Sequence, residues 1–271
     1  MKSFSFLSKT QGKTIRSLAI TLSLFCFNLE SFGSKQSLTS RLSNIKSKTI
    51  SYSPKLKEKL EQNKKLKGTV DEIYSKYNSY AVSFANNALN LEKIVKKTSI
   101  FGKVFISSGG KKLRKILRIY IQESANLALT QEKLFASSQV SEQTLLTVLT
   151  KTKKLIPFLT KLMILREKIQ PYYSKLSKKK KNDIQKIMNS KISKNSAPQR
   201  FDSYMIMPIQ WSTRIPMLFQ EYFKVKGNMT TAEKEALAQS RQERQKMDFV
   251  KEIDEWWVDC QLKKPKASCK Y

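Results

Sequence analysis

The chain of 271 residues contains no histidine, so the side chain used most often as a general base and as a metal ligand is missing. The three cysteines, Cys26, Cys260 and Cys269, are too few and too scattered for a metal cage or a disulfide framework. Cys260 and Cys269 could pair in an oxidising compartment. The Gly109-Gly110 pair lacks the flanking pattern of a phosphate-binding loop. We therefore expect no cofactor, no metal and no covalent chemistry, and a function that resides in a surface.

Glycine and proline are also scarce, with seven of each. Acidic residues number 21 against 52 lysines and arginines, which leaves a formal net charge of +31. Apolar residues make up 40% of the chain, which is enough for a sizeable core. Because Lys, Leu, Ile, Gln and Glu are plentiful, long helices are favoured over many short strands. We predict an all-α protein that forms a single elongated helical bundle of about 200 residues.

The first 34 residues have the order of a secretory signal peptide. They contain no acid before Glu30, carry basic residues from Lys2 to Arg16, and continue with an apolar run from Ser17 to Phe27. Small residues then precede a cleavage position after Gly33. The run is far shorter than the ~20 residues that cross a bilayer. A disordered or amphipathic basic leader and an organelle transit peptide are the alternatives, and in each case we exclude residues 1–34 from the fold.

The rest of the chain divides into a Ser-, Lys- and Thr-rich linker at 35–53, a helical domain at 54–260 and a basic tail at 261–271. Apolar residues at steps of three and four predict the helices. The expected helices span 54–98, 111–136, 141–168, 174–192, 205–224 and 227–257. Pro157 is expected to kink or bound the third of them. Thr230 and Glu233 have the spacing of a capping box, which marks the start of the last helix.

Lysine runs, of which Lys178–Lys181 is the densest, have three explanations. The first is a solvated surface. The second is attraction to anionic membrane lipids, at ~1 kcal/mol per basic residue near the surface. Nucleic-acid binding is the third and is disfavoured, since no reader motif accompanies the charge.

The segment MPIQWSTRIPMLFQEYFK, which starts at Met207, combines two different stripes on one helix. Trp211, Ile215, Leu218 and Tyr222 recur at steps of four, three and four and are expected to face the core. The neighbouring stripe consists of Gln210, Arg214, Met217 and Glu221. A buried stripe would be apolar and a solvated one would carry lysines in this protein. Arginine and methionine without lysine favour a protein-binding surface.

This segment resembles the signature helix of the Dbl-homology domain, the catalytic module of Rho-family guanine-nucleotide exchange factors. The family pattern is Pro-x-Gln-Arg-x-x-Arg/Lys-Tyr-x-Leu-Leu-Leu-x-Glu-Leu, and here Pro208, Gln210, Arg214, Leu218 and Glu221 match it without a gap. Trp211 departs from the pattern because it replaces the first arginine, and Ile215 departs because it replaces the tyrosine. The resemblance extends more weakly over residues 60–260.

The resemblance implies a mechanism without a nucleophile, in which the domain grips both switch regions of a small GTPase and expels GDP. Arg214 would contact the second switch, with Gln210, Met217 and Glu221 beside it on the same stripe. The family glutamate that meets the first switch corresponds to Asp71 or Glu72 if the chain is aligned on Tyr74. If the chain is aligned on Tyr80 instead, no acidic residue stands at the position of the family glutamate.

At the closing helix of the family, Asp254 occupies the position of an asparagine, so an acceptor-only carboxylate replaces a group that also donates. The implied partner is a Rho-family small GTPase. A helical scaffold that binds without exchange, and a basic protein of membrane or nucleic-acid surfaces, remain the alternatives. The leader combined with such a regulator suggests export and action in a host cell, with an ordinary cytoplasmic regulator as the other interpretation.

Overall fold

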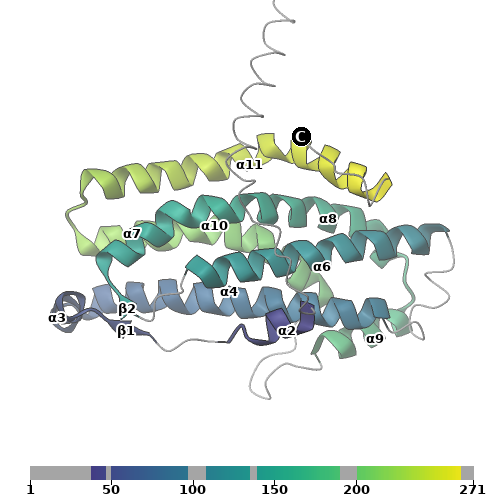
Figure 1. Cartoon of the computed structure of the whole chain (residues 1–271), viewed down its shortest axis with the longest axis horizontal. Coiled ribbons are helices and arrows are strands. Elements are labelled where there is room, and N and C mark those ends of the chain that lie inside the picture. Colours follow the sequence, from purple (N-terminus) through teal and green to yellow (C-terminus); the bar gives the residue numbers. More distant parts are fainter. Residues whose placement is uncertain (1–37, 47–49, 97–107, 135–138, 190–199, 264–271) are drawn as a thin grey trace, which may run out of the picture.

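The computed structural model describes residues 38–46, 50–96, 108–134, 139–189 and 200–263. The predicted leader and residues 264–271 lie outside these ranges. In the described part the chain forms an all-α bundle, and its longest helices run along the long axis of the molecule (Figure 1). The predicted fold class is therefore confirmed.

The elements follow one another as long helices joined by short connections. In chain order they are α2 (Leu38–Ser43), β1 (Ser51–Tyr52), α3 (Pro54–Gln62), α4 (Lys64–Lys96), α6 (Ser108–Leu134), β2 (Gln139–Val140), α7 (Glu142–Lys151), the 3₁₀ turn η1 (Thr152–Leu155), α8 (Ile156–Ser174), α9 (Lys178–Asn189), α10 (Phe201–Lys226) and α11 (Thr231–Lys263). The two short strands pair in parallel, with Tyr52 opposite Val140.

Part of the segment predicted as a linker contributes to the bundle. Leu42 of α2 and Ile45 after it are buried, at 1% and 6% exposure, and α2 packs against α4 and α6. Further along, the Ser53 amide donates to the Val140 carbonyl at 2.8 Å, which extends the β1–β2 pairing. Residues 38–53 therefore pack on the body of the molecule wherever they are described.

The single helix predicted from Pro54 is in fact two helices, α3 and α4, so this prediction was wrong at Asn63. Asn63 has extended dihedral angles, with φ −134° and ψ 90°. Its Oδ1 accepts a hydrogen bond of 3.0 Å from the Leu66 amide, which is one of the free donors at the start of α4. An asparagine in this place stabilises a new helix start. Gly68 lies inside α4.

The expected boundary at Pro157 and the expected start of the last helix are confirmed, although the single helix predicted over 141–168 is in fact divided into α7, η1 and α8. Pro157 stands in the first turn of α8, where a missing N–H removes no hydrogen bond. At the start of α11 the Thr230 amide donates to Glu233 Oε2 at 2.9 Å, and the Glu233 amide donates to Thr230 Oγ1 at 3.3 Å. This reciprocal pair is the predicted capping box.

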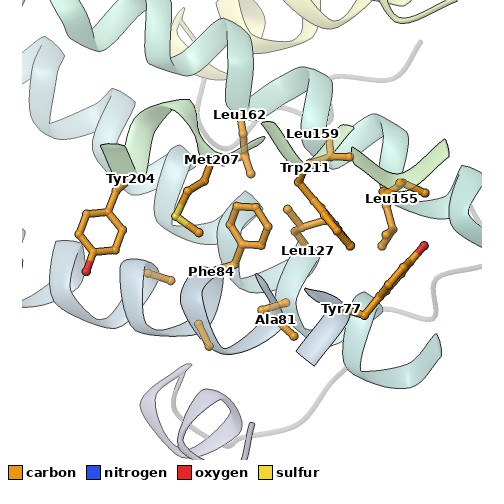
Figure 2. Packing of buried hydrophobic residues seen from close by; sticks show 14 of the residues in the cluster. Tyr77, Ala81, Phe84, Leu127, Leu155, Leu159, Leu162, Tyr204, Met207 and Trp211 are labelled. Atoms are coloured by element: carbon orange, nitrogen blue, oxygen red, sulfur yellow. The ribbon is translucent and has the colours of Figure 1, made fainter. Parts of the chain in front are cut away.

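The core lies between α4, α6, α8 and α10, and Figure 2 shows its central part. Phe84 of α4 lies beside Met207 of α10 there, while Tyr77, earlier in α4, contacts Trp211, later in α10. The two helices are therefore antiparallel. α10 continues through Pro208 and Pro216 to Lys226, so both prolines lie inside it.

Candidate protein-binding site on α10

Trp211 joins α10 to α4 at the centre of the bundle. The indole has 0% exposure, although the Dbl-homology pattern has an arginine there. It stacks on Tyr80 with ring centroids 4.3 Å apart and an interplanar angle of 18°. It also meets the edge of Tyr77, with centroids 4.6 Å apart at 80°. Aromatic pairs of this kind contribute about 0.5–1.5 kcal/mol each beyond the area they bury.

A buried polar chain links the same residues to α6 and η1. The Trp211 Nε1–H donates to Gln131 Oε1 at 3.1 Å, and Gln131 Nε2 donates to the Tyr77 carbonyl at 2.6 Å. The hydroxyls of Tyr77 and Thr152 lie 2.8 Å apart, and Thr152 donates its own proton to the Val148 carbonyl, so Tyr77 is the donor. Since each member has partners, burial of these polar groups is compensated. This series of buried hydrogen bonds fixes the rotation of α10 about its own axis.

With Trp211 held inside, the neighbouring stripe of α10 faces solvent. Gln210, Arg214, Met217 and Glu221 are all exposed, and we call these four residues the α10 ridge. Met217 is 65% exposed, and no other large apolar side chain in the described ranges is as exposed. The predicted division of this helix into a core stripe and an exposed stripe is therefore confirmed, with Leu218 half-buried between them.

Arg214 lies at the border between α10 and α4. Burial raises the pKa of Tyr80, and the nearby Arg214 guanidinium opposes that rise, so the two groups are electrostatic neighbours. Among the described carboxylates none lies within ion-pair distance of Arg214. The nearest acid on the ridge, Glu221, is only in loose contact with Lys224, at 4.0 Å. The guanidinium is available to a carboxylate or carbonyl of another molecule.

Asp71 and Glu72, the two candidates for the first-switch contact, have different surroundings. The Tyr52 hydroxyl of β1 donates a hydrogen bond to Asp71 Oδ1, and Asp71 is half-buried. At ~100° per residue, Asp71 and Tyr80 lie about 180° apart around α4, so Asp71 is on the flank away from the ridge. Glu72 is exposed and lies about 80° from Tyr80. Of the two, Glu72 is the one that can extend a surface centred on α10.

Asp254, the last predicted site residue, belongs to α11, but its side chain lies outside the described part of the structure. The structure thus brings together the four ridge residues, places Glu72 on the adjacent helix and separates Asp71 from them. Tyr80 and Gln131 were not predicted as part of this site. Gln131 follows Leu127 by four residues and precedes Leu134 by three, so a polar residue within an apolar stripe was the available signal.

The described residues also bear on metal sites, membrane spans and disulfides. No group of three or more Cys, Asp or Glu side chains in the described ranges could hold a metal ion. Within those ranges no helix combines the length and the hydropathy needed to cross a membrane. Cys260 is disulfide-bonded, and the predicted pairing with Cys269 involves a residue outside the described ranges. Comparisons with protein-family models, with curated proteins and with solved structures find no match to this chain.

Proposed function

We propose that the α10 ridge, together with the exposed part of α4 beside it, binds a Rho-family small GTPase and accelerates the release of its GDP. The observation that carries this proposal is Arg214, exposed and outside every described ion pair, on a helix that Trp211 anchors in the core. The likeness of residues 208–221 to the Dbl-homology signature supplies the partner class. Exchange of this kind needs no reactive side chain, which suits a chain without histidine.

The ridge would act by differential binding. An exchange factor accelerates nucleotide release because it binds the nucleotide-free conformation of the GTPase more tightly than the loaded one. Arg214 would pair with a carboxylate or carbonyl near the second switch, and Met217 would bury its exposed side chain against the GTPase. Glu72 would contact the first switch, and Gln210 would support the surface next to Arg214. The resemblance assigns Asp254 to the edge of the same surface.

Replacing Arg214 by alanine is expected to reduce exchange about tenfold or more, because hydrogen bonds to charged groups contribute about 1.5–3 kcal/mol each. The measurement is the release of fluorescent GDP from a panel of Rho and Rac proteins with the full-length chain. Arg241→Ala is the matched control, since Arg241 is an exposed arginine on α11. Equal release with the wild-type chain and without it, for every GTPase in the panel, would refute the exchange function.

A second function, binding without exchange, is favoured by two observations. Trp211 is buried where the family has an arginine, and Asp71 is bound by Tyr52 and turned away from the ridge. Both changes remove groups that the family presents to its partner. In that case the GTPase would be retained by the wild-type chain and lost by Arg214→Ala, while the rate of GDP release would stay at its intrinsic value.

For localisation we propose export through residues 1–34, followed by action in a host cell that contains Rho-family GTPases. Support comes from the order of charged, apolar and small residues in that segment, and from Cys260, because disulfides form in oxidising compartments. Fractionation of the producing cells should then recover a shortened chain outside the cytoplasm. Recovery of the intact chain from the cytoplasm alone would favour the ordinary intracellular regulator instead.

A further inference from the structure

One end of the bundle gathers the start of α6 and the whole of α9. Leu91 and Ile94 near the end of α4, Leu113 and Leu117 near the start of α6, and Ile184 of α9 all line one small apolar pocket. Phe201, at the start of α10, lines it as well. Figure 1 shows α9 at the right, where α4 ends. Side chains from α6 and α9 that point outward here therefore lie at the same end of the molecule.

The outward side chains at this end are basic. Seven of them are exposed and together form what we call the basic end: Lys111, Lys112, Lys115, Arg118, Lys178, Lys179 and Lys186. Lys111, Lys115 and Arg118 recur at steps of four and three, and Lys179 and Lys186 are seven residues apart, so each set forms one outer stripe of its helix. α6 contains no acid before Glu123.

Few negative charges oppose this set. Glu92 of α4 is already paired with Lys96 at 2.8 Å, α9 contributes only Asp183, and the start of α10 adds the exposed Asp202. At the other end of the molecule the charges are mixed: Lys59 pairs with Glu142 at 2.8 Å, and Lys226 pairs with Glu233 at 2.5 Å. Acids and bases therefore alternate more closely at the opposite end, which also carries exposed lysines, whereas acids are sparse around the basic end.

We propose that the basic end docks on an anionic membrane surface. Six of its seven residues are lysines, which act as point charges and suit diffuse attraction to lipid headgroups, whereas arginine favours planar recognition of individual phosphates. Tyr173, an aromatic residue at this end, is stacked on Phe201 with centroids 4.3 Å apart, so this ring does not offer a free face to a nucleic-acid base. These features favour lipid over nucleic acid as the occupant.

This docking is independent of the proposed exchange activity and compatible with it. Phe201 lies beside the basic end, and Glu221 follows twenty residues later in the same helix, which is about 30 Å at 1.5 Å per residue. The α10 ridge therefore extends away from the membrane surface. A protein bound to the ridge and a bilayer bound to the basic end would not compete for space.

The test compares two fourfold variants of the full chain in sedimentation with vesicles. The first carries K111Q, K115Q, K179Q and K186Q at the basic end. The matched control carries K55Q, K64Q, K65Q and K67Q, four exposed lysines of α3 and α4 near the opposite end, so both variants lose the same charge. Vesicles contain phosphatidylcholine with or without phosphatidylserine, at low and at high salt. Circular dichroism verifies that both variants keep the helical content of the wild type.

The wild type and the control should bind the phosphatidylserine vesicles at low salt, and the basic-end variant should bind several hundredfold more weakly, roughly 600-fold, since each of its four replaced residues contributes roughly fivefold near the surface. An equal loss of vesicle binding in both variants would mean that only the net charge of the protein matters, and would refute the basic end as the docking site. Wild-type chain that does not bind phosphatidylserine at low salt would also overturn it. Tighter binding to DNA or RNA than to vesicles at equal phosphate, lost in the same variant, would reassign the surface to nucleic acid.

Discussion

Replacing Trp211 by alanine is expected to lower the free energy of unfolding by about 4 kcal/mol, the middle of the range for a buried aromatic residue. The indole is completely buried, stacks on Tyr80 and meets the edge of Tyr77. Its loss leaves a cavity between α4 and α10 and removes the hydrogen bond that satisfies Gln131 Oε1. Urea denaturation followed by circular dichroism measures the change.

Trp211→Phe separates the packing of this residue from its hydrogen bond. A phenyl ring keeps an aromatic group against Tyr80 but cannot donate to Gln131, so a smaller loss of about 1–3 kcal/mol is expected from the unsatisfied acceptor and the lost volume. Replacing Gln131 by methionine in the Trp211→Phe background should recover part of that loss, because the unpaired polar group is then removed. Two single variants that both unfold like the wild type would show that Trp211 does not hold the core together.

The position of Trp211 also bears on the proposed function. A tryptophan in place of the family arginine could either remove a contact residue from the surface or pack in the core. The structure places it in the core. The ridge next to it keeps an exposed arginine, a glutamine and a glutamate at their matching positions. Under the proposed function, rigid anchoring of α10 would lower the entropy that is lost when a partner binds the ridge.

The sequence was sufficient to predict those features that depend on local periodicity. The two stripes of α10 follow from steps of three and four residues, and these steps fix which side chains share a face whatever the partner helix is. The capping box of α11 depends on Thr230 and Glu233 alone, so its hydrogen bonds could also be predicted. The exposure of Arg214 and the burial of Trp211 are consequences of the same rule.

Features that join distant segments could not be predicted in this way. Tyr52 reaches Asp71 only because β1 pairs with β2, which comes far later in the chain. The pairing thus gives Asp71, the preferred candidate for the first-switch contact, a partner that local periodicity could not predict. The break at Asn63 escaped prediction for a different reason, since the apolar steps continue across it and asparagine is tolerated within many helices.

The end of the bundle opposite the basic end is held by a network of ion pairs. Lys226, in the last turn of α10, lies 2.5 Å from Glu233 of α11 and 3.8 Å from Glu142 of α7. The side chains of Lys226 and Glu233 are only 14% and 6% exposed. Burial and these two carboxylates raise the pKa of Tyr222 as well, so this tyrosine remains neutral beside them. Lys226 therefore lies between acids of two other helices, and Lys59 of α3 also pairs with Glu142, at 2.8 Å.

Lys226→Met is expected to reduce the free energy of unfolding by about 3 kcal/mol, because removing one partner of a buried pair leaves the other charge uncompensated. Methionine retains the apolar stem, so the loss reports the charge rather than the packing. Lys224→Met is the matched control: Lys224 is 75% exposed and lies 4.0 Å from Glu221, so its replacement should change stability by less than about 0.5 kcal/mol. Similar losses in the two variants would show that the network does not stabilise the fold.

The same network predicts how the stability difference between the wild type and Lys226→Met depends on pH. Burial by itself raises the pKa of Glu233, but hydrogen bonds from Lys226 and Thr230 more than offset this, and the pKa lies below its ordinary value of 4.5. A carboxyl with a depressed pKa in the folded state binds fewer protons there than in the unfolded state. Its contribution is therefore present above about pH 4.5 and is lost as the pH falls through the lower, folded value. Urea denaturation of both proteins should show a large difference in the free energy of unfolding at about pH 7 and a small one at about pH 3. An equal difference at the two pH values would mean that Lys226 acts through packing and not through Glu233.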